Sequence, residues 1–189
     1  FEDVPVVLET EAGVQAFDIP NPPSIQQPLI ASLVDELRGN GHSPSNGISA
    51  ARTKGWRKPE GAVIVSRPSR FGNPCRVGLM QEMGYDDPHA AAAANYETWL
   101  RGNRYDAPTD DADQRRERIL ADLPTLRGRD LACTCQSDQA CHADVLLRLA
   151  NLPEAELAAW VASARDLVDR QRLAWGLEPL YANAPAEAA

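Results

Sequence analysis

Hydrophobic residues recur along the chain at two spacings, which separate predicted helices from predicted strands. Helical spacing predicts helices over residues 28–38, 88–100, 110–123 and 141–149, and another from Pro153 to about Trp175. Compact apolar runs predict short strands at 4–8, 62–66 and 130–135. Strands and helices therefore alternate through the middle of the chain, a pattern typical of α/β domains.

Local signals place the start of two helices more sharply. Asp87 followed by Pro88 is a capping acid with proline at the first helical position. A second helix is expected to begin near Thr109 or Asp110, where acids in the first turn favour the helix dipole, and to end at Pro124. The segment between the strand at 62–66 and Gly78 is predicted to be a loop.

We predict an α/β fold with a small Rossmann-like, three-layer sheet, flanking helices, and extensions at both ends. Residues 1–50 are expected to be an N-terminal extension of strand, Pro-rich linker and helix. Residues 51–151 are expected to form the α/β domain, and residues 152–189 a C-terminal amphipathic helix with a frayed tail. In open α/β sheets, ligands gather at the carboxyl ends of the strands, where the loops after residues 66 and 133 fall.

Charge is distributed unevenly along the chain. The net charge is −8, yet residues 52–76 contain seven basic residues and only one acid, Glu60. This concentration of positive charge predicts an anionic, nucleotide-like small molecule as ligand, with nucleic acid as an alternative. The simpler interpretation is a solvent-exposed basic loop without a ligand. No apolar run is long enough for a membrane span, and three clustered cysteines favour reduced thiols and a cytoplasmic location. Composition says nothing about the oligomeric state.

A basic loop supplies the first group of candidate ligand-binding residues. Two arginines flank a turn in which glycine permits either positive φ or a close approach, and guanidinium forks suit phosphate or carboxylate. An aromatic residue, Phe71 or Trp56, is available to stack on a base. The predicted anion-binding residues are Arg67, Ser69, Arg70, Gly72, Asn73 and Trp56.

A Cys/His cluster supplies the second group. Strand alternation sends Cys133 and Cys135 to one face, and a tight return brings Cys141 and His142 toward them. Four such ligands suit zinc, although only one residue separates the first pair; an iron–sulfur cluster is an alternative. A non-metal reading makes Cys141 at a helix N-terminus the nucleophile, with His142 and Asp144 as proton carriers. The third interpretation is that the cysteines are buried only for packing and that Asp144 caps a helix.

Taken together, four segments carry a family resemblance: Arg52 to Glu60, Arg67 to Pro74, Leu131 to Cys135, and Cys141 to Asp144. In this order they resemble the domain-of-unknown-function family 4326 over about residues 51–151. The family is small and often phage-borne, so the resemblance implies positions but no reaction. Compared with that pattern, this chain has Phe71 where Trp is usual, Cys75 where Phe or Tyr is usual, and Thr134 where Trp is usual.

Two functional hypotheses follow. The first is an enzyme acting on a nucleotide, nucleobase or modified nucleic-acid component, with the basic loop facing the Cys/His cluster. The alternative is a zinc-stabilised module that docks an acidic partner or nucleic acid, or a phage accessory protein that uses the fold without catalysis.

Overall fold

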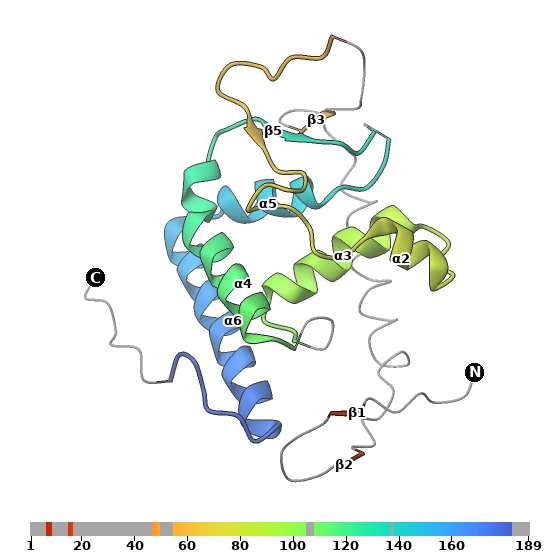
Figure 1. Cartoon of the computed structure of the whole chain (residues 1–189). Coiled ribbons are helices and arrows are strands. Elements are labelled where there is room, and N and C mark those ends of the chain that lie inside the picture. Colours follow the sequence, from red (N-terminus) through yellow and green to blue (C-terminus); the bar gives the residue numbers. More distant parts are fainter. Residues whose placement is uncertain are drawn as a thin grey trace.

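The computed structural model describes residues 55–104, 108–136 and 138–182, together with the backbone of the short strands at 7–8, 15–16 and 47–49 (Figure 1). The helix predicted at 28–38 and the tail from residue 183 lie outside these residues. Of the predicted strand at 4–8, the structure describes β1, Val7–Leu8, which pairs antiparallel with β2, Gln15–Ala16.

The central feature is a parallel sheet of three short strands in the order β3-β5-β4. β3 is Gly47–Ser49, β4 is Val63–Ile64 and β5 is Leu131–Cys133. Backbone amides of Val63 and Val65 donate to the carbonyls of Asp130 and Ala132 at 2.8 and 2.9 Å, which aligns the carboxyl ends of β4 and β5. The apolar runs at 62–66 and 130–135 are thus confirmed as strands, each shorter than predicted.

The helices begin and end close to the predicted positions, with one addition. They are α2 (Val77–Glu82), α3 (Pro88–Leu100), α4 (Asp110–Asp122), the 3-10 helix η1 (Leu123–Leu126), α5 (His142–Ala150) and α6 (Glu154–Ala174). As expected, the side chains of Asp87 and Thr109 accept backbone amides at the starts of α3 and α4, at 2.9 and 3.2 Å.

The helix α2 was not predicted, because the predicted loop ended at Gly78 and residues 79–86 were assigned to no element. It has only six residues and no side-chain cap, so local sequence carries little signal for it. Instead Met80 packs against Ala91 and Ala92 of α3, which means that tertiary burial stabilises this turn.

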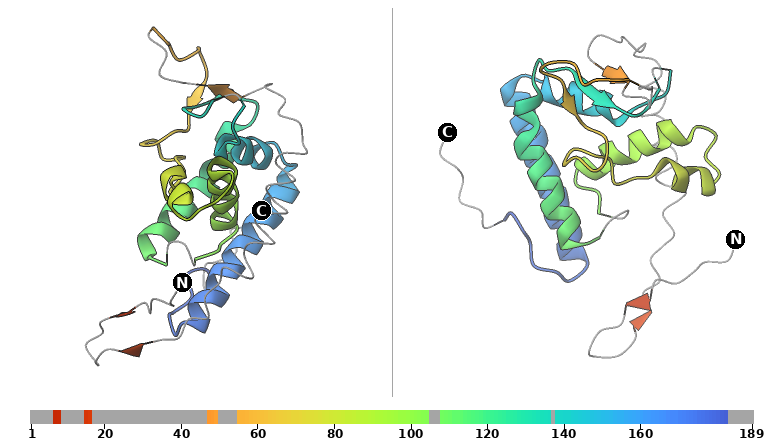
Figure 2. Two further views of the ribbon diagram at one scale, coloured as in Figure 1. Left: turned by 90° about the vertical axis from the view of Figure 1, so that its right-hand side faces the viewer. Right: turned by 45° about the horizontal axis from the view of Figure 1, so that its top comes forward.

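The hydrophobic core lies between the sheet and the helices α3, α4 and α5. Large buried side chains include Tyr96, Trp99, Ile119, Leu131 and Leu146. α4 and α6 run side by side (Figure 1 and Figure 2), joined by an ion pair between Glu117 and Arg165.

The described helices all lie on the same side of the parallel sheet in the three views of Figures 1 and 2. Consistent with this, the Ile64 side chain of β4 is 43% exposed, whereas Val65 is buried. The α/β prediction is therefore confirmed as a mixed structure with a small parallel sheet, and the three-layer, Rossmann-like arrangement remains a prediction. Among the described residues, no helix combines the length and apolar character needed to cross a bilayer.

Candidate functional site

The candidate site lies where the two parallel strands β4 and β5 end. β4 leads into Arg67 and β5 leads into Cys135, and these strands are neighbours with the same direction. The N-terminus of α5 is tied to the same edge, because His142 Nε2 lies 3.0 Å from the carbonyl oxygen of Val65. The sheet thus brings together segments about seventy positions apart, as predicted.

A cavity of about 130 Å³ joins the two predicted groups. The basic loop contributes Arg67 and Asn73 to its wall, while the second group contributes Cys133, Cys135 and His142. The remaining lining residues are Ser66, Cys75, Val77, His89, Ala92, Ala93, Thr134 and Ala140. Residues of both motifs therefore line one cavity, which makes the two motifs parts of one candidate site.

Three sulfur atoms are gathered beside the cavity. The Sγ atoms of Cys133, Cys135 and Cys141 all lie within 4.8 Å of one another, and those of Cys133 and Cys135 are 3.6 Å apart. With a Zn–S distance of about 2.3 Å, two sulfurs of a tetrahedral zinc site lie about 3.8 Å apart. The cluster therefore has the size and the soft ligands that zinc prefers, in spite of the short Cys133 to Cys135 spacing.

His142 faces the same sulfurs with its other nitrogen. The Val65 carbonyl only accepts hydrogen bonds, so in the neutral ring the proton is on Nε2 and Nδ1 carries a lone pair. This Nδ1 lies 3.8 Å from the Sγ atoms of both Cys133 and Cys141. A buried imidazole with one nitrogen held by a backbone carbonyl and the other aimed at thiols is the arrangement that metal-bound histidines adopt.

Hydrogen bonds among the three thiols shift their pKa values in opposite directions. Hydrogen bonding with Cys135, and then with Cys141, lowers the pKa of Cys133 far below the usual thiol value. The hydrogen bond to Cys133 raises the pKa of Cys135 to about 11 and also raises that of Cys141. Cys133 is therefore the thiol most ready to ionise, whereas the sequence pointed to Cys141.

Cys141 and Asp144 form the cap of α5. The Cys141 sulfur accepts from the amide of Ala143 at 3.4 Å, and the Asp144 carboxylate accepts from the amide of Cys141 at 3.3 Å. The capping residue is thus Cys141, and Asp144 stands at the third position of the capping box instead of at the cap itself. Asp144 does not line the cavity, and its catalytic role remains a prediction.

The basic loop is a tight turn held from behind by the core. Gly72 donates its amide to the Ser69 carbonyl at 3.0 Å, and Tyr96 donates its hydroxyl to the Phe71 carbonyl at 2.9 Å. Asn73 is buried and bridges two backbones, donating to Ala92 and accepting from the amide of Cys75. Its side chain holds the cavity wall in place. Phe71 is buried in the core, so the proposed stacking of a base on this ring is not available.

Gly72 is required for a close approach and not for positive φ. A Cβ added here would stand 2.8 Å from Arg67 Cγ and 3.0 Å from the Arg67 backbone. We expect Gly72→Ala to lower the free energy of unfolding by about 1–3 kcal/mol, because the loop that carries Arg67 must shift. Urea unfolding measures this, with Gly78→Ala as control, since a Cβ at Gly78 of α2 meets no atom within 4 Å. Equal free energies of unfolding for the two variants would contradict this prediction, because they would show that the loop accepts a Cβ at Gly72 without strain.

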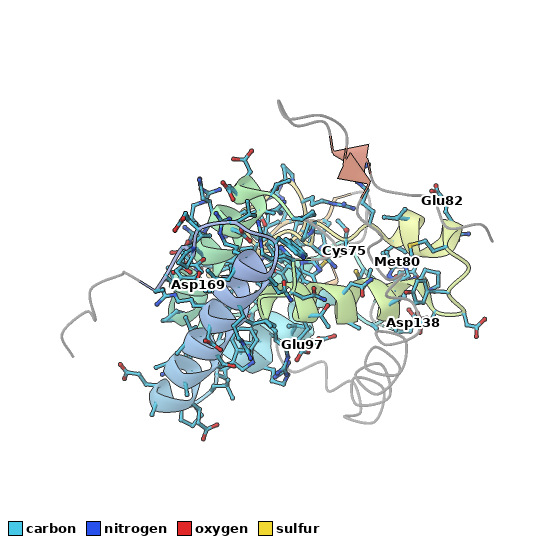
Figure 3. All side chains as sticks on the ribbon, turned by 90° about the horizontal axis from the view of Figure 1, so that it is seen from below. Cys75, Met80, Glu82, Glu97, Asp138 and Asp169 are labelled. Carbon is cyan, nitrogen blue, oxygen red and sulfur yellow. The ribbon has the colours of Figure 1, made fainter. Side chains whose placement is uncertain are left out.

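Some predicted ligand residues lie outside this cavity. Ser69 and Arg70 line a second cavity, described below, and Trp56 lines neither. Conversely, Cys75 and His89 line the first cavity, although the sequence offered only an isolated cysteine beside a turn and a histidine near a helix start. Figure 3 shows Cys75 on the α2 side of the molecule with Met80, away from Asp169 of α6.

The fold and the site define a class of protein: an α/β domain that gathers three thiols, an imidazole and an arginine loop at the carboxyl edge of a parallel sheet. The chain belongs to a family described as a domain of unknown function (DUF4326), whose model matches residues 48–152. This match confirms the family resemblance. No curated protein and no solved structure matches the chain.

Proposed function

We propose that the protein is an enzyme acting on a nucleotide, a nucleobase or a modified component of nucleic acid, with the cavity between the basic loop and the Cys/His cluster as its active site. The observation that carries this proposal is the shared cavity, which is lined both by Arg67 and by Cys133, Cys135 and His142. A ligand-binding site at the carboxyl ends of parallel strands is also what a Rossmann-like sheet predicts.

The thiol cluster supports zinc as the cofactor. Cys133, Cys135 and Cys141 would supply three thiolate ligands, and Cys133 and Cys135 also line the cavity. With a fourth position open, zinc polarises a carbonyl or lowers the pKa of a bound water. Three thiolates give a zinc centre one net negative charge, and Arg67 on the facing wall would offset it.

The size of the cavity limits which part of a ligand enters it. Pockets for whole small molecules usually measure about 300–1,000 Å³, so a cavity of about 130 Å³ admits only one ring or head group. We infer that the reacting group enters while the rest of the molecule remains outside, near the basic loop. We also propose a cytoplasmic location, because three cysteines within nine positions suit reduced thiols better than disulfides.

Turnover of a compound panel by zinc-loaded protein tests this proposal. Nucleobases, nucleosides and nucleotides would be incubated with wild type and followed by mass spectrometry. We expect Arg67→Gln and Cys133→Ser to lose turnover of any compound that wild type converts, because each replaces a side chain that lines the cavity. Arg170→Gln, which removes an exposed charge on α6, should keep it. If wild type neither binds nor converts any member of the panel, the enzyme proposal is wrong.

One observation favours a second candidate, a zinc-stabilised binding module. His142 Nδ1 lies 3.8 Å from two of the sulfurs and would complete a closed four-ligand site. Cobalt substitution separates the candidates. In an open site, added azide binds the metal and changes the visible absorption of Co²⁺, whereas in a closed site it does not. His142→Ala should make a closed site responsive to azide.

A further inference from the structure

A second cavity also includes Arg67 in its lining. It measures about 370 Å³ and is lined by Arg67, Pro68, Ser69, Arg70, Arg115 and Arg118. Four of these six residues are arginines, and none of the six is acidic. Arg115 and Arg118 come from α4, and the other two arginines come from the basic loop.

The arginines are not equally engaged with protein partners. Arg115 donates to the Gly72 carbonyl, which anchors its guanidinium at the turn. Arg70 forms an ion pair with Asp122 at 2.8 Å and lies over the Phe71 ring. By contrast, Arg67 and Arg118 form no ion pair with any residue in the described part of the chain. The cavity thus combines two anchored guanidinium groups with two that have hydrogen-bond donors to offer a ligand.

Electrostatics argues that this cavity takes an anion. Four guanidinium groups around one space repel one another, and Asp122 is the one carboxylate that the structure pairs with them in the described residues. The Ser69 hydroxyl is buried at the same wall and has no hydrogen-bond partner among the described residues. A bound anion would offset the repulsion and also accept from this hydroxyl.

We propose that Arg67, Arg70, Arg115 and Arg118 form a binding site for a phosphate group. A carboxylate has two oxygens and one charge, which one arginine fork satisfies. A phosphate ester offers up to three free oxygens and up to two charges, which suits several guanidinium groups that converge from a loop and a helix.

Arg67 lines both cavities, so it connects the phosphate site to the thiol cavity. This link rests on the proposed function: a nucleotide would place its phosphate among the arginines and its reacting group beside the thiols. The phosphate site itself rests only on the arginine cavity.

Titration of the protein with inorganic phosphate, followed by calorimetry at low ionic strength, tests the site. We expect Arg115→Gln and Arg118→Gln each to weaken phosphate binding about tenfold, the usual loss for a hydrogen bond to a charged group. Arg170→Gln removes the same charge from the exposed face of α6 and should change the affinity less than twofold, because screened surface charges act weakly.

Equal losses in all three variants, or no binding of phosphate by wild type, would overturn the site. Nucleoside monophosphates and short oligonucleotides in the same titration identify the source of the phosphate. Binding of either with the same dependence on Arg118 supports the site, whereas binding of both without that dependence overturns it. Phosphate binding without turnover of any compound would retain the site and reject only the enzyme proposal.

Discussion

Zinc is expected to stabilise this protein in proportion to the logarithm of its free concentration. A ligand that binds only the folded state adds about 1.4 kcal/mol for each tenfold rise in free ligand above its dissociation constant, or about 4 kcal/mol at a thousandfold excess. The sulfurs of Cys133, Cys135 and Cys141 lie within 4.8 Å only because β5 and the start of α5 are folded together. The unfolded chain has no such preformed cluster.

Urea unfolding in zinc buffers of increasing free concentration measures this slope. Cys133→Ser should show no dependence on zinc, since it loses the central thiol of the cluster. Cys75→Ser is the matched control, because Cys75 lines the same cavity but lies outside the three-sulfur group. A wild-type stability that does not change with zinc, or a Cys75→Ser variant as insensitive as Cys133→Ser, would rule out the three-thiol site.

Removing the carboxylate of Asp113 is expected to destabilise the protein by about 3–5 kcal/mol, the usual cost of leaving buried charges without a partner. Asp113 is fully buried and pairs with Arg104 at 2.9 Å and with Arg116 at 2.6 Å. Both of these arginine side chains are almost completely buried as well. Asp113→Ala would leave Arg116 without an ion-pair partner among the described residues, and Arg104 with only Asp110 at 3.8 Å.

Asp111→Ala is the control for this prediction. Asp111 is exposed in the same first turn of α4, where an acid interacts mainly with the helix dipole. Its loss should cost at most about 1 kcal/mol. Thermal and urea unfolding of the two variants would be compared with wild type. A loss below about 1 kcal/mol for Asp113→Ala would mean that the buried arginines find other partners, and the proposed role of Asp113 would fail.

Local features of the sequence could be predicted because neighbouring residues determine them. Asp87 with Pro88 starts α3, and Thr109 starts α4, because a cap acts on amides three residues away. The apolar run at 62–66 forms a strand because β-branched side chains suit a buried sheet. Strand alternation likewise predicted that the sulfurs of Cys133 and Cys135 would be close.

Other features depend on the tertiary structure, since their residues are distant in the sequence. The role of Asp113 could not be predicted, because an aspartate that pairs with two buried arginines and an exposed aspartate in the first turn of a helix look alike in the sequence. Arg115 and Arg118 were missed for the same reason, since only the packing of α4 against the basic loop makes them part of a cavity. Phe71 turned inward because Tyr96 and the core hold the backbone of its turn.

The sequence by itself determined the kinds of residues at the site, the helix starts and the order of strands and helices, because these follow from contacts within a few positions. Only the tertiary structure decided which side chains share a cavity. The parallel pairing of β4 and β5 brought Arg67 and Cys133 to one cavity, and the packing of α3 and α4 added His89, Arg115 and Arg118 to the cavity walls. Such convergence depends on the burial of the whole core, which no local window of sequence contains.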